Sequence, residues 1–444
     1  MRTGAHRSLF LLMTQTYLPA PSTIVRWNLR QLYLDIFWFG VLAGSILAFI
    51  SVYAARLGAT SIQIGLLSAG PAVVNLLITL PAGQWLEGKP LIRAAFISSL
   101  GQRAGYLLLV FLPFVFHQTI QVWAIILLTL MMSISGTLLA ISFNAMYAEV
   151  VPVEWRGKAA GWRNGLVAIS MTITTLMSGY ILDQVIFPLN YQIVFLIGTI
   201  GALMSSYHLS RVRKPGDGVE LHAPAAKPNQ ENLKKVHWSD WLLHQVRGRR
   251  GSSRLASKPL LRLDVLRGPF GLFMAGCLAF YAFQYFSLPV FPLFYVNELN
   301  LTDGEISLGS SLFNGTMMLG SLFLYRLSAR YGHRKVMLIG VSLFGLFPLL
   351  LGFARDASLF YLACAFSGPI VALINVGLIN RLMERVPDND RPAHMALHNL
   401  ALNLGVLTGS LLGPVVADWM GLRDVLYLSA GLRLLAALLL WRWG

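Results

Sequence analysis

Two charged residues stand out because they lie at or within long apolar stretches of the sequence. Asp35 begins the first stretch, and Arg103 lies about two helical turns inside the third. A charge inside a bilayer is costly and therefore usually has a function or a partner. The two residues could pair with each other, or Asp35 could bind a proton. Alternatively, Asp35 caps a helix at the interface, and Arg103 reaches the headgroups or bonds backbone carbonyls. The residues alone leave these interpretations open.

The residue patterns of common membrane enzymes are absent from the sequence. It contains neither an HExxH zinc motif nor a Walker sequence, GxxxxGK[ST]. Cys277 and Cys364, the only cysteines, both fall in apolar runs, so they offer no disulfide framework and no CxxC metal site. We therefore expect no cofactor, no metal site and no catalytic residues, and we predict that the protein is not an enzyme.

A polar motif of sixteen residues occurs twice in the chain. Residues 149–164 read EVVPVEWRGKAAGWRN, and residues 384–399 read ERVPDNDRPAHMALHN. A shift of 235 positions matches Glu149, Val151, Pro152, Arg156 and Asn164 with Glu384, Val386, Pro387, Arg391 and Asn399. A second match, of residues 57–66 with 299–308, occurs at a shift of 242. Matched charge, proline and spacing favour a duplication over chance, so we predict two related halves.

A row of small residues accompanies the second copy of the motif. Gly405, Gly409 and Gly413 recur at four-residue spacing, and the same shift of 235 aligns them with Ser170, Thr174 and Ser178. Small residues at this spacing form one helix face, against which a neighbouring backbone can approach closely. We therefore predict tight helix packing at both places.

The composition is that of a membrane protein. Of 444 residues, 56% are hydrophobic and only 12% are charged, whereas about a quarter of the residues in an average soluble domain are charged. Apolar runs near the length that crosses a bilayer as a helix recur along the chain. The predicted spans are 35–55, 62–85, 94–114, 121–146, 162–182, 190–209, 269–294, 305–327, 336–354, 358–380, 396–417 and 424–443.

The net charge of +16 follows the predicted topology. Most of the 35 Lys and Arg residues fall on one side of the membrane, whereas only Arg56, Arg355 and Arg423 fall on the other. This one-sided excess is the positive-inside pattern, which predicts that both termini are cytoplasmic. The basic charge therefore does not call for a nucleic-acid partner.

The same topology divides the chain into four segments. We predict a cytoplasmic N-terminal segment (1–31), a first six-helix bundle (32–210), a cytoplasmic linker (211–267) and a second six-helix bundle (268–444). The predicted fold class is an all-α membrane protein with twelve transmembrane helices in two related bundles.

Twelve spans, cytoplasmic termini, a long central loop and a duplicated half together resemble the major facilitator superfamily. A loop motif of this family has the form GxxxDRxGRR. The matching loop here, 83–93, reads GQWLEGKPLIR, and its second-half counterpart, 329–335, reads ARYGHRK. The resemblance covers nearly the whole chain in topology, although the first loop lacks the central arginine–glycine pattern and the second has Ala329 in place of the acid.

The loop motifs and the duplicated motif suggest a gate at the cytoplasmic rim. Carboxylates beside arginines form charge-assisted hydrogen bonds that can lock one conformation. The candidates in the first half are Glu87, Arg93, Glu149 and Arg156, and those in the second half are Arg330, Arg334, Lys335, Glu384 and Arg391. The alternative is a set of solvated charges that only determines topology.

The resemblance also implies which helices line a central cavity: mainly the first, fourth, seventh and tenth of the chain, helped by the second, fifth, eighth and eleventh. The polar candidates on these helices are Asn75, Asn144, Tyr281, Gln284, Asn314, Asn375 and Asn403. Aromatic faces with a few amides suit an amphipathic or weakly charged substrate, whereas any single aromatic ring could instead face lipid. Because the third helix is peripheral in this family and no acid is predicted at the middle of a span, structural roles are favoured for Asp35 and Arg103. Arg433, in the last span, is interpreted in the same way.

These observations predict a secondary transporter in the cell membrane. It would carry a small amphipathic or weakly charged molecule by alternating access between the two halves. We expect a monomer that spans the membrane many times, with a small-molecule substrate and with H+ or another ion as a coupling partner. The alternatives are a transport-inactive sensor or scaffold with the same fold and, less favoured, an intramembrane enzyme.

Overall fold

The computed structural model describes residues 21–86, 88–214, 263–387 and 391–444. Regular secondary structure within these ranges is entirely helical. The predicted gate residue Glu87 lies outside the described residues, as do the N-terminal segment up to residue 20 and most of the linker.

The first half contains six long helical segments, of which the first is continuous through a short π-helical stretch. They are α2 (Thr23–Leu42) with η1 (Ala43–Leu47) and α3 (Ala48–Arg56), α4 (Ser61–Leu86), α5 (Leu91–Val115), α6 (Gln118–Val150), α7 (Val153–Gln184) and α8 (Leu189–Ser210). The first segment begins earlier than the sequence predicts, because Ser22 caps α2 by accepting a hydrogen bond from the Val25 backbone amide.

The second half repeats this arrangement after a single 3-10 turn, η2 (Leu263–Leu266). Its helices are α10 (Pro269–Ser287) with α11 (Val290–Leu293) and η3 (Phe294–Glu298), α12 (Asp303–Tyr331), α13 (His333–Leu343) with α14 (Leu346–Phe353), α15 (Ala357–Arg385), α16 (Arg391–Met420) and α17 (Leu422–Trp443). Eleven helical segments of the described chain are long and apolar enough to cross a membrane. The remaining one, α12, has 29 residues and is long enough to do the same.

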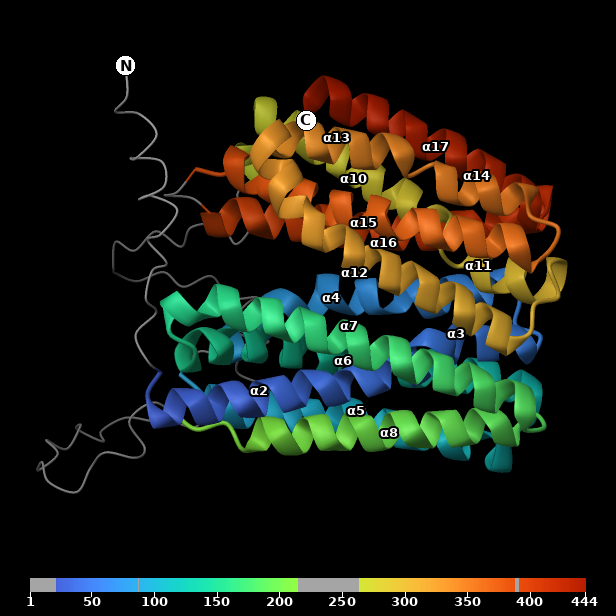
Figure 1. Cartoon of the computed structure of the whole chain (residues 1–444), viewed down its shortest axis with the longest axis horizontal. Helices are drawn as coiled ribbons and strands as arrows, with labels where there is room; N and C mark the ends of the chain where they lie inside the picture. Colours follow the sequence, from blue (N-terminus) through green and yellow to red (C-terminus); the bar gives the residue numbers. More distant parts are fainter. Residues whose placement is uncertain (1–20, 87, 215–262, 388–390) are drawn as a thin grey trace, which may run out of the picture.

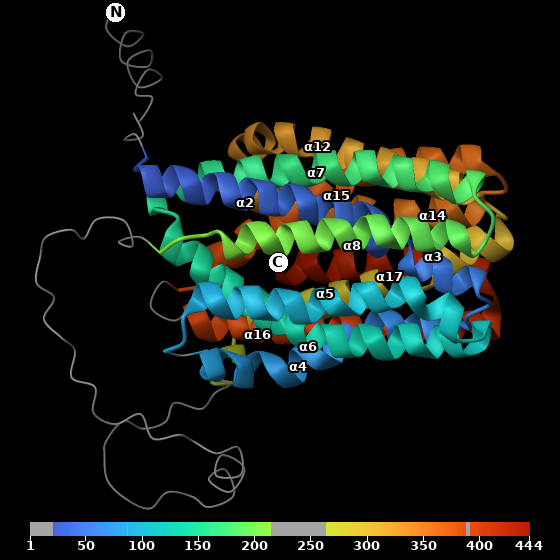
Figure 2. The ribbon, with the colours of Figure 1, turned by 90° about the horizontal axis from the view of Figure 1, so that it is seen from below.

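The helices form two bundles that lie side by side. Figure 1 shows the first half, blue to green, below the second half, yellow to red. The halves meet along two seams, α7 against α12 and α4 against α16. Figure 2, seen from below, shows these two seams on opposite edges of the molecule. This is the arrangement that the duplicated sequence predicts.

The structure explains two of the sequence patterns, the match of residues 57–66 with 299–308 and the row of small residues. Thr60 and Gln63 exchange side-chain-to-backbone hydrogen bonds before α4, and Thr302 and Glu305 do the same before α12. These reciprocal caps explain the match of 57–66 with 299–308. The row of small residues also packs as predicted, because a side chain added at Gly409 or Gly413 would collide with the backbone of α10.

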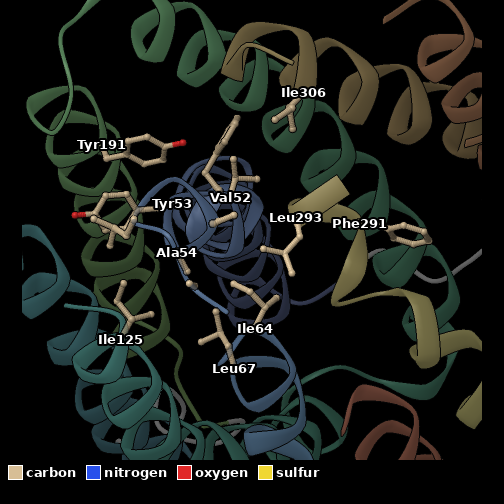
Figure 3. Close-up of a cluster of buried hydrophobic side chains, with 14 of the residues drawn as sticks. Val52, Tyr53, Ala54, Ile64, Leu67, Ile125, Tyr191, Phe291, Leu293 and Ile306 are labelled. Carbon is tan, nitrogen blue, oxygen red and sulfur yellow. The ribbon is translucent and has the colours of Figure 1, made fainter. Parts of the chain in front are cut away.

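The hydrophobic core is continuous between the halves at one end only. One cluster joins α3, α4 and α8 of the first half to α11 and α12 of the second. Figure 3 shows its members, with Tyr53 and Tyr191 from the first half and Leu293 and Ile306 from the second. At the end that holds the start of α2 and the end of α17, each half has a core of its own. The halves are therefore joined at one end and separate at the other.

Arg433 holds together the interrupted helices of the second half. Its guanidinium donates to the carbonyl of Phe344, between α13 and α14 (3.2 Å), and to the carbonyl of Gln284, near the end of α10 (3.1 Å). It also donates to the Ser287 hydroxyl (3.0 Å) and lies 4.1 Å from the Phe344 ring centroid. This buried arginine bonds carbonyls, which is the structural role that the sequence favours for it.

We expect Arg433→Leu to lower the stability of the folded protein by about 3 kcal/mol, because it leaves several buried acceptors without a donor. A fall in the apparent Tm of the purified protein in detergent would measure this loss. Arg442→Leu is the control, because Arg442 lies exposed on the same helix. Equal Tm values for the two variants would contradict the role of Arg433.

Candidate transport site and the contacts that join the halves

Asp35 lies at the centre of a buried polar cluster in the first half. Because α2 begins at Thr23, Asp35 is about three turns inside the helix, and it is only 5% exposed. The sequence-based expectations that Asp35 starts the span or caps the helix are therefore wrong. The polar residues that precede Asp35 also belong to the helix. Among them, Arg26 and Arg30 are exposed near the start of α2. The first span therefore carries a carboxylate well within its length.

Asp35 contacts residues of two other helices, and a residue of a third helix is linked to it through Ser205. Its Oδ1 accepts a hydrogen bond from the Ser205 hydroxyl on α8 (2.6 Å), and its Oδ2 lies 3.7 Å from Arg163 Nη2 on α7. Arg103 Nη2 on α5 donates to the oxygen of the same Ser205 (2.7 Å). Asp35 and Arg103 are thus linked through Ser205 rather than in direct contact.

The cluster holds more positive than negative charge. One carboxylate faces two guanidinium groups, and in the described structure Nε and Nη1 of Arg103 have no hydrogen-bond partner. Arg163 also lies over the rings of Phe143 and Tyr147 on α6, at 4.6 and 5.7 Å from their centroids. Protonation of Asp35 would remove the only negative charge in this set. The cluster can therefore change its charge balance with a single proton.

Arg163 is a partner that the sequence analysis missed. It stands at the edge of the predicted span 162–182 and was not among the candidates, whereas α7 begins ten residues earlier, at Val153. The signal that could have found it is the position of Asp35: a buried carboxylate requires a cation, and Arg163 lies on the fifth helical segment of the same half.

Two of the predicted amides meet across the seam between α4 and α16. Asn75 Nδ2 donates to Asn403 Oδ1 at 3.4 Å, a long hydrogen bond, and Asn75 Oδ1 accepts from the Thr137 hydroxyl on α6 (2.6 Å). Asn403 Nδ2 in turn donates to the carbonyl oxygen of Asn399 (2.8 Å). This chain of amides joins the first half to the second between otherwise apolar helices.

The second half has a polar pair at the place that corresponds to the Asp35 cluster, without a carboxylate. The Tyr281 hydroxyl and His398 Nε2 are 2.9 Å apart, and both residues are buried. The shift of 235 that aligns the duplicated motif pairs His398 with Arg163. The sequence analysis predicted Tyr281 but not His398, whose place on α16 facing α10 becomes visible only once the helices are packed.

The other predicted cavity residues are dispersed. Asn314 is buried, Gln284 is half-buried, and Asn144 and Asn375 are exposed. None of these four side chains is joined to the Asp35 cluster or to the amide chain by a hydrogen bond in the described structure. They therefore contribute no further contact between the halves here.

The predicted gate residues of the first half form other contacts in this conformation. Arg156 donates to the carbonyls of Ala148 (2.6 Å) and Val151 (3.1 Å), which end α6. Glu149 instead lies 3.6 Å from Lys214 Nζ. The predicted pairing of Glu149 with Arg156 is thus replaced, because the free carbonyls at the end of α6 take the guanidinium. Arg93 forms no ion pair with a described residue.

The described contacts of the gate residues of the second half are all with residues of the same half. Glu384 accepts from Arg381 (2.8 Å), which also donates to the Gly444 carbonyl. Arg334 donates to the Trp441 carbonyl (3.3 Å). Of the other candidates, Arg330 lies over the Tyr331 ring, Lys335 is exposed, and the side chain of Arg391 lies outside the described atoms. None of the described pairs at this end joins the two halves.

The opposite end carries ionic contacts between the halves. Asp183, at the end of α7, accepts from the Gly304 backbone amide (2.9 Å) and the Thr302 hydroxyl (3.1 Å) at the start of α12. Arg56 Nη2 lies 3.1 Å from Asp303 Oδ1. A carboxylate at a helix N-terminus is favoured by the exposed N–H groups and the helix dipole. We call these contacts the clasp.

Gly304 is required at the clasp for a steric reason. A Cβ atom at this position would collide with the Asp183 carboxylate. Because Gly304 has no side chain, the Asp183 carboxylate of the first half can reach the backbone amide of the second half.

Comparison with known proteins agrees with this architecture. The chain is 24% identical over 325 residues to macrolide efflux protein A of Streptococcus pyogenes, covering 71% of this chain and 72% of that one. It is 23% identical over 150 residues to multidrug resistance protein 2 of Bacillus subtilis, covering 34% of this chain and 37% of that one. A bacterial homologue of the iron transporter ferroportin, solved in the inward-facing state, superposes with a TM-score of 0.70 at 14% identity, over 95% of this chain and 99% of that one.

The fold and the relatives together define a multi-pass membrane protein that acts as a secondary transporter of small molecules. The family model described as Major Facilitator Superfamily matches residues 34–288 and 272–444, so the chain belongs to this superfamily. The resemblance inferred from the sequence is thereby confirmed.

We expect Asp183→Ala to weaken the clasp and shift the population toward the conformation that is open at this end. Spin labels or cysteine probes on the two halves beside the clasp would report a longer separation or faster modification. Asp418→Ala is the matched control, because the shift of 235 aligns Asp418 with Asp183, yet Asp418 is exposed and has no described partner. Unchanged probe distances in Asp183→Ala would contradict the clasp.

Proposed function

We propose that this protein exports a small amphipathic or weakly charged molecule from the cell. The observation that carries the proposal is the chain of hydrogen bonds from the Thr137 hydroxyl through Asn75 to Asn403. This chain crosses from the first half to the second. A few hydrogen-bonding groups in an apolar surround suit a largely hydrophobic ligand with a few polar atoms. The direction of transport rests on the relatives, whose names record macrolide efflux and multidrug resistance.

The transport cycle would alternate the end at which the halves meet. In the conformation described, the clasp and the shared core join the halves at one end, while the other end has separate cores. We infer that the protein is a monomer in the cell membrane with both termini cytoplasmic, so that this conformation is open to the cytoplasm. Release of the clasp and closure of the opposite end would then expose the site to the outside. The gate candidates at the cytoplasmic rim would form their contacts between the halves in that second state.

We propose that H+ is the coupling ion and that Asp35 carries it. With Asp35 ionised, the carboxylate holds Arg163 of α7 and, through Ser205, Arg103 of α5. With Asp35 neutral, the two guanidinium groups lose their counter-charge, and α2 and α7 lose their ion pair. Proton binding would thereby favour a different packing of α2 against its neighbours.

The proposal of export is tested by flux. Cells that lack their own efflux systems and express the protein are expected to accumulate less of a labelled macrolide than cells without it. Purified protein in proteoliposomes should move the same compound when a pH gradient is imposed. A broad panel of amphipathic compounds without any flux would support the sensor or scaffold instead.

We expect Asp35→Asn to reduce pH-driven flux by tenfold or more while substrate binding persists, because Asn cannot bind and release the coupling proton. Flux in proteoliposomes and equilibrium binding of the same labelled compound measure the two quantities separately. Asp424→Asn is the control, because Asp424 lies exposed in the first turn of α17. Normal pH-driven flux in Asp35→Asn would exclude Asp35 as the proton carrier.

A further inference from the structure

A groove runs between α2 and α7 at the end where the two halves are separate. Its volume is about 640 Å³. We call it the α2–α7 groove. On α7 its lining includes Trp162, which continues a row of exposed apolar residues formed by Ile169, Ile173 and Tyr180. Such a row on a membrane-spanning helix faces lipid. The groove therefore opens to the bilayer.

The lining of the groove contains three cations and no acid. Arg26 and Arg30 come from the first two turns of α2, and Lys158 comes from the second turn of α7. All three are exposed, and none forms an ion pair within the described chain. Arg26 Nε donates to the Pro21 carbonyl, and Lys158 Nζ lies 5.0 Å from the Trp155 ring centroid. The neighbouring acid Glu154 is exposed and pairs with none of them.

Aromatic and aliphatic side chains form the rest of the groove. Tyr33, Phe37, Trp155 and Trp162 line it. Tyr and Trp rings favour the headgroup level of a bilayer, where one edge is apolar and the other is wet. Leucines from both helices complete the apolar wall. Cations at the mouth and an apolar wall beyond them match a ligand with an anionic head and hydrocarbon chains.

The second half provides an internal comparison. A groove of about 730 Å³ lies between α10 and α16, the counterparts of α2 and α7, and its lining contains only apolar residues and glycine. The shift of 235 aligns Trp162 with Leu397, and the shift of 242 aligns Arg30 with Leu272. The fold thus forms the groove twice, but only the first copy carries cations and aromatic rings. The basic lining is a property of this one site and not of the architecture.

We propose that the α2–α7 groove binds an anionic phospholipid. The phosphate lies among Arg26, Arg30 and Lys158, and an acyl chain runs along Phe37 and Trp162. Each cation near an anionic headgroup contributes to the affinity, and the guanidinium of Arg30 is free to take the phosphate. This inference concerns binding at the lipid-facing surface and is independent of the substrate that the protein carries.

Native mass spectrometry of the full-length protein in detergent tests the proposal. The protein is titrated with phosphatidylglycerol and, separately, with phosphatidylcholine of the same acyl chains. Wild type is expected to bind phosphatidylglycerol more tightly. The double variant Arg30→Gln/Lys158→Gln should lower that affinity about thirtyfold, roughly fivefold for each charge, and leave phosphatidylcholine binding unchanged. Arg267→Gln/Arg442→Gln is the control, because it removes two exposed cations of the second half.

Two further measurements separate the alternatives. Trp162→Leu, which copies the residue of the second groove, keeps the charges and should weaken phosphatidylglycerol binding several-fold through lost contact. Arg30→Gln alone should give about a fivefold loss and serves if the double variant does not fold. Equal losses in the control variant, or equal affinity of wild type for the two lipids, would overturn the proposal. Displacement of the lipid by excess inorganic phosphate would show a simple ion site and overturn it as well.

Discussion

The contact of the Asp183 carboxylate with the N-terminus of α12 joins the two halves at one end of the molecule. It acts at the end of a seam where α7 and α12 are already packed, and Arg56 with Asp303 reinforces it. The hydrophobic core then becomes continuous between the halves at this end. Ionic contacts at a rim are individually weak, so the clasp adds direction to an association in which the shared core buries most of the apolar surface. At the other end each bundle has a core of its own.

The two halves share a scaffold but not a charge pattern. Where the first half pairs Arg163 with Asp35, the second half places His398 beside Tyr281, and the duplicated position of Asp35 is taken by Cys277. The duplication thus gives two equivalent frames, and only the first places a carboxylate between its helices at this position. The buried charge of the second half, Arg433, instead bonds backbone carbonyls and a hydroxyl.

The sequence predicts the fold well and the site only in part. Periodic apolar runs and the repeated motif suffice for two six-helix bundles, because length and hydropathy determine spans in a bilayer. Asn75 and Asn403 were predicted separately, but their meeting depends on how α4 packs against α16. The depth of Asp35 was misjudged because Arg26 and Arg30 made the first turns of α2 look like a loop. Arg163 was missed because the predicted span began at residue 162, which made this arginine look like a charge at the membrane rim, whereas α7 begins at Val153.

The buried cluster around Asp35 has a consequence for biogenesis. Asp35 belongs to the first helical segment of this bundle, whereas Arg103, Arg163 and Ser205 follow on the third, fifth and sixth helical segments. Until those segments are inserted, the carboxylate has none of these partners, and an unpaired polar group in hydrocarbon is unfavourable. The contacts of Asp35 are therefore complete only after α8 has been synthesised. The packing of α2 thus depends on contacts with the last helix of the same bundle, and the order of synthesis separates the carboxylate from its partners by most of that bundle.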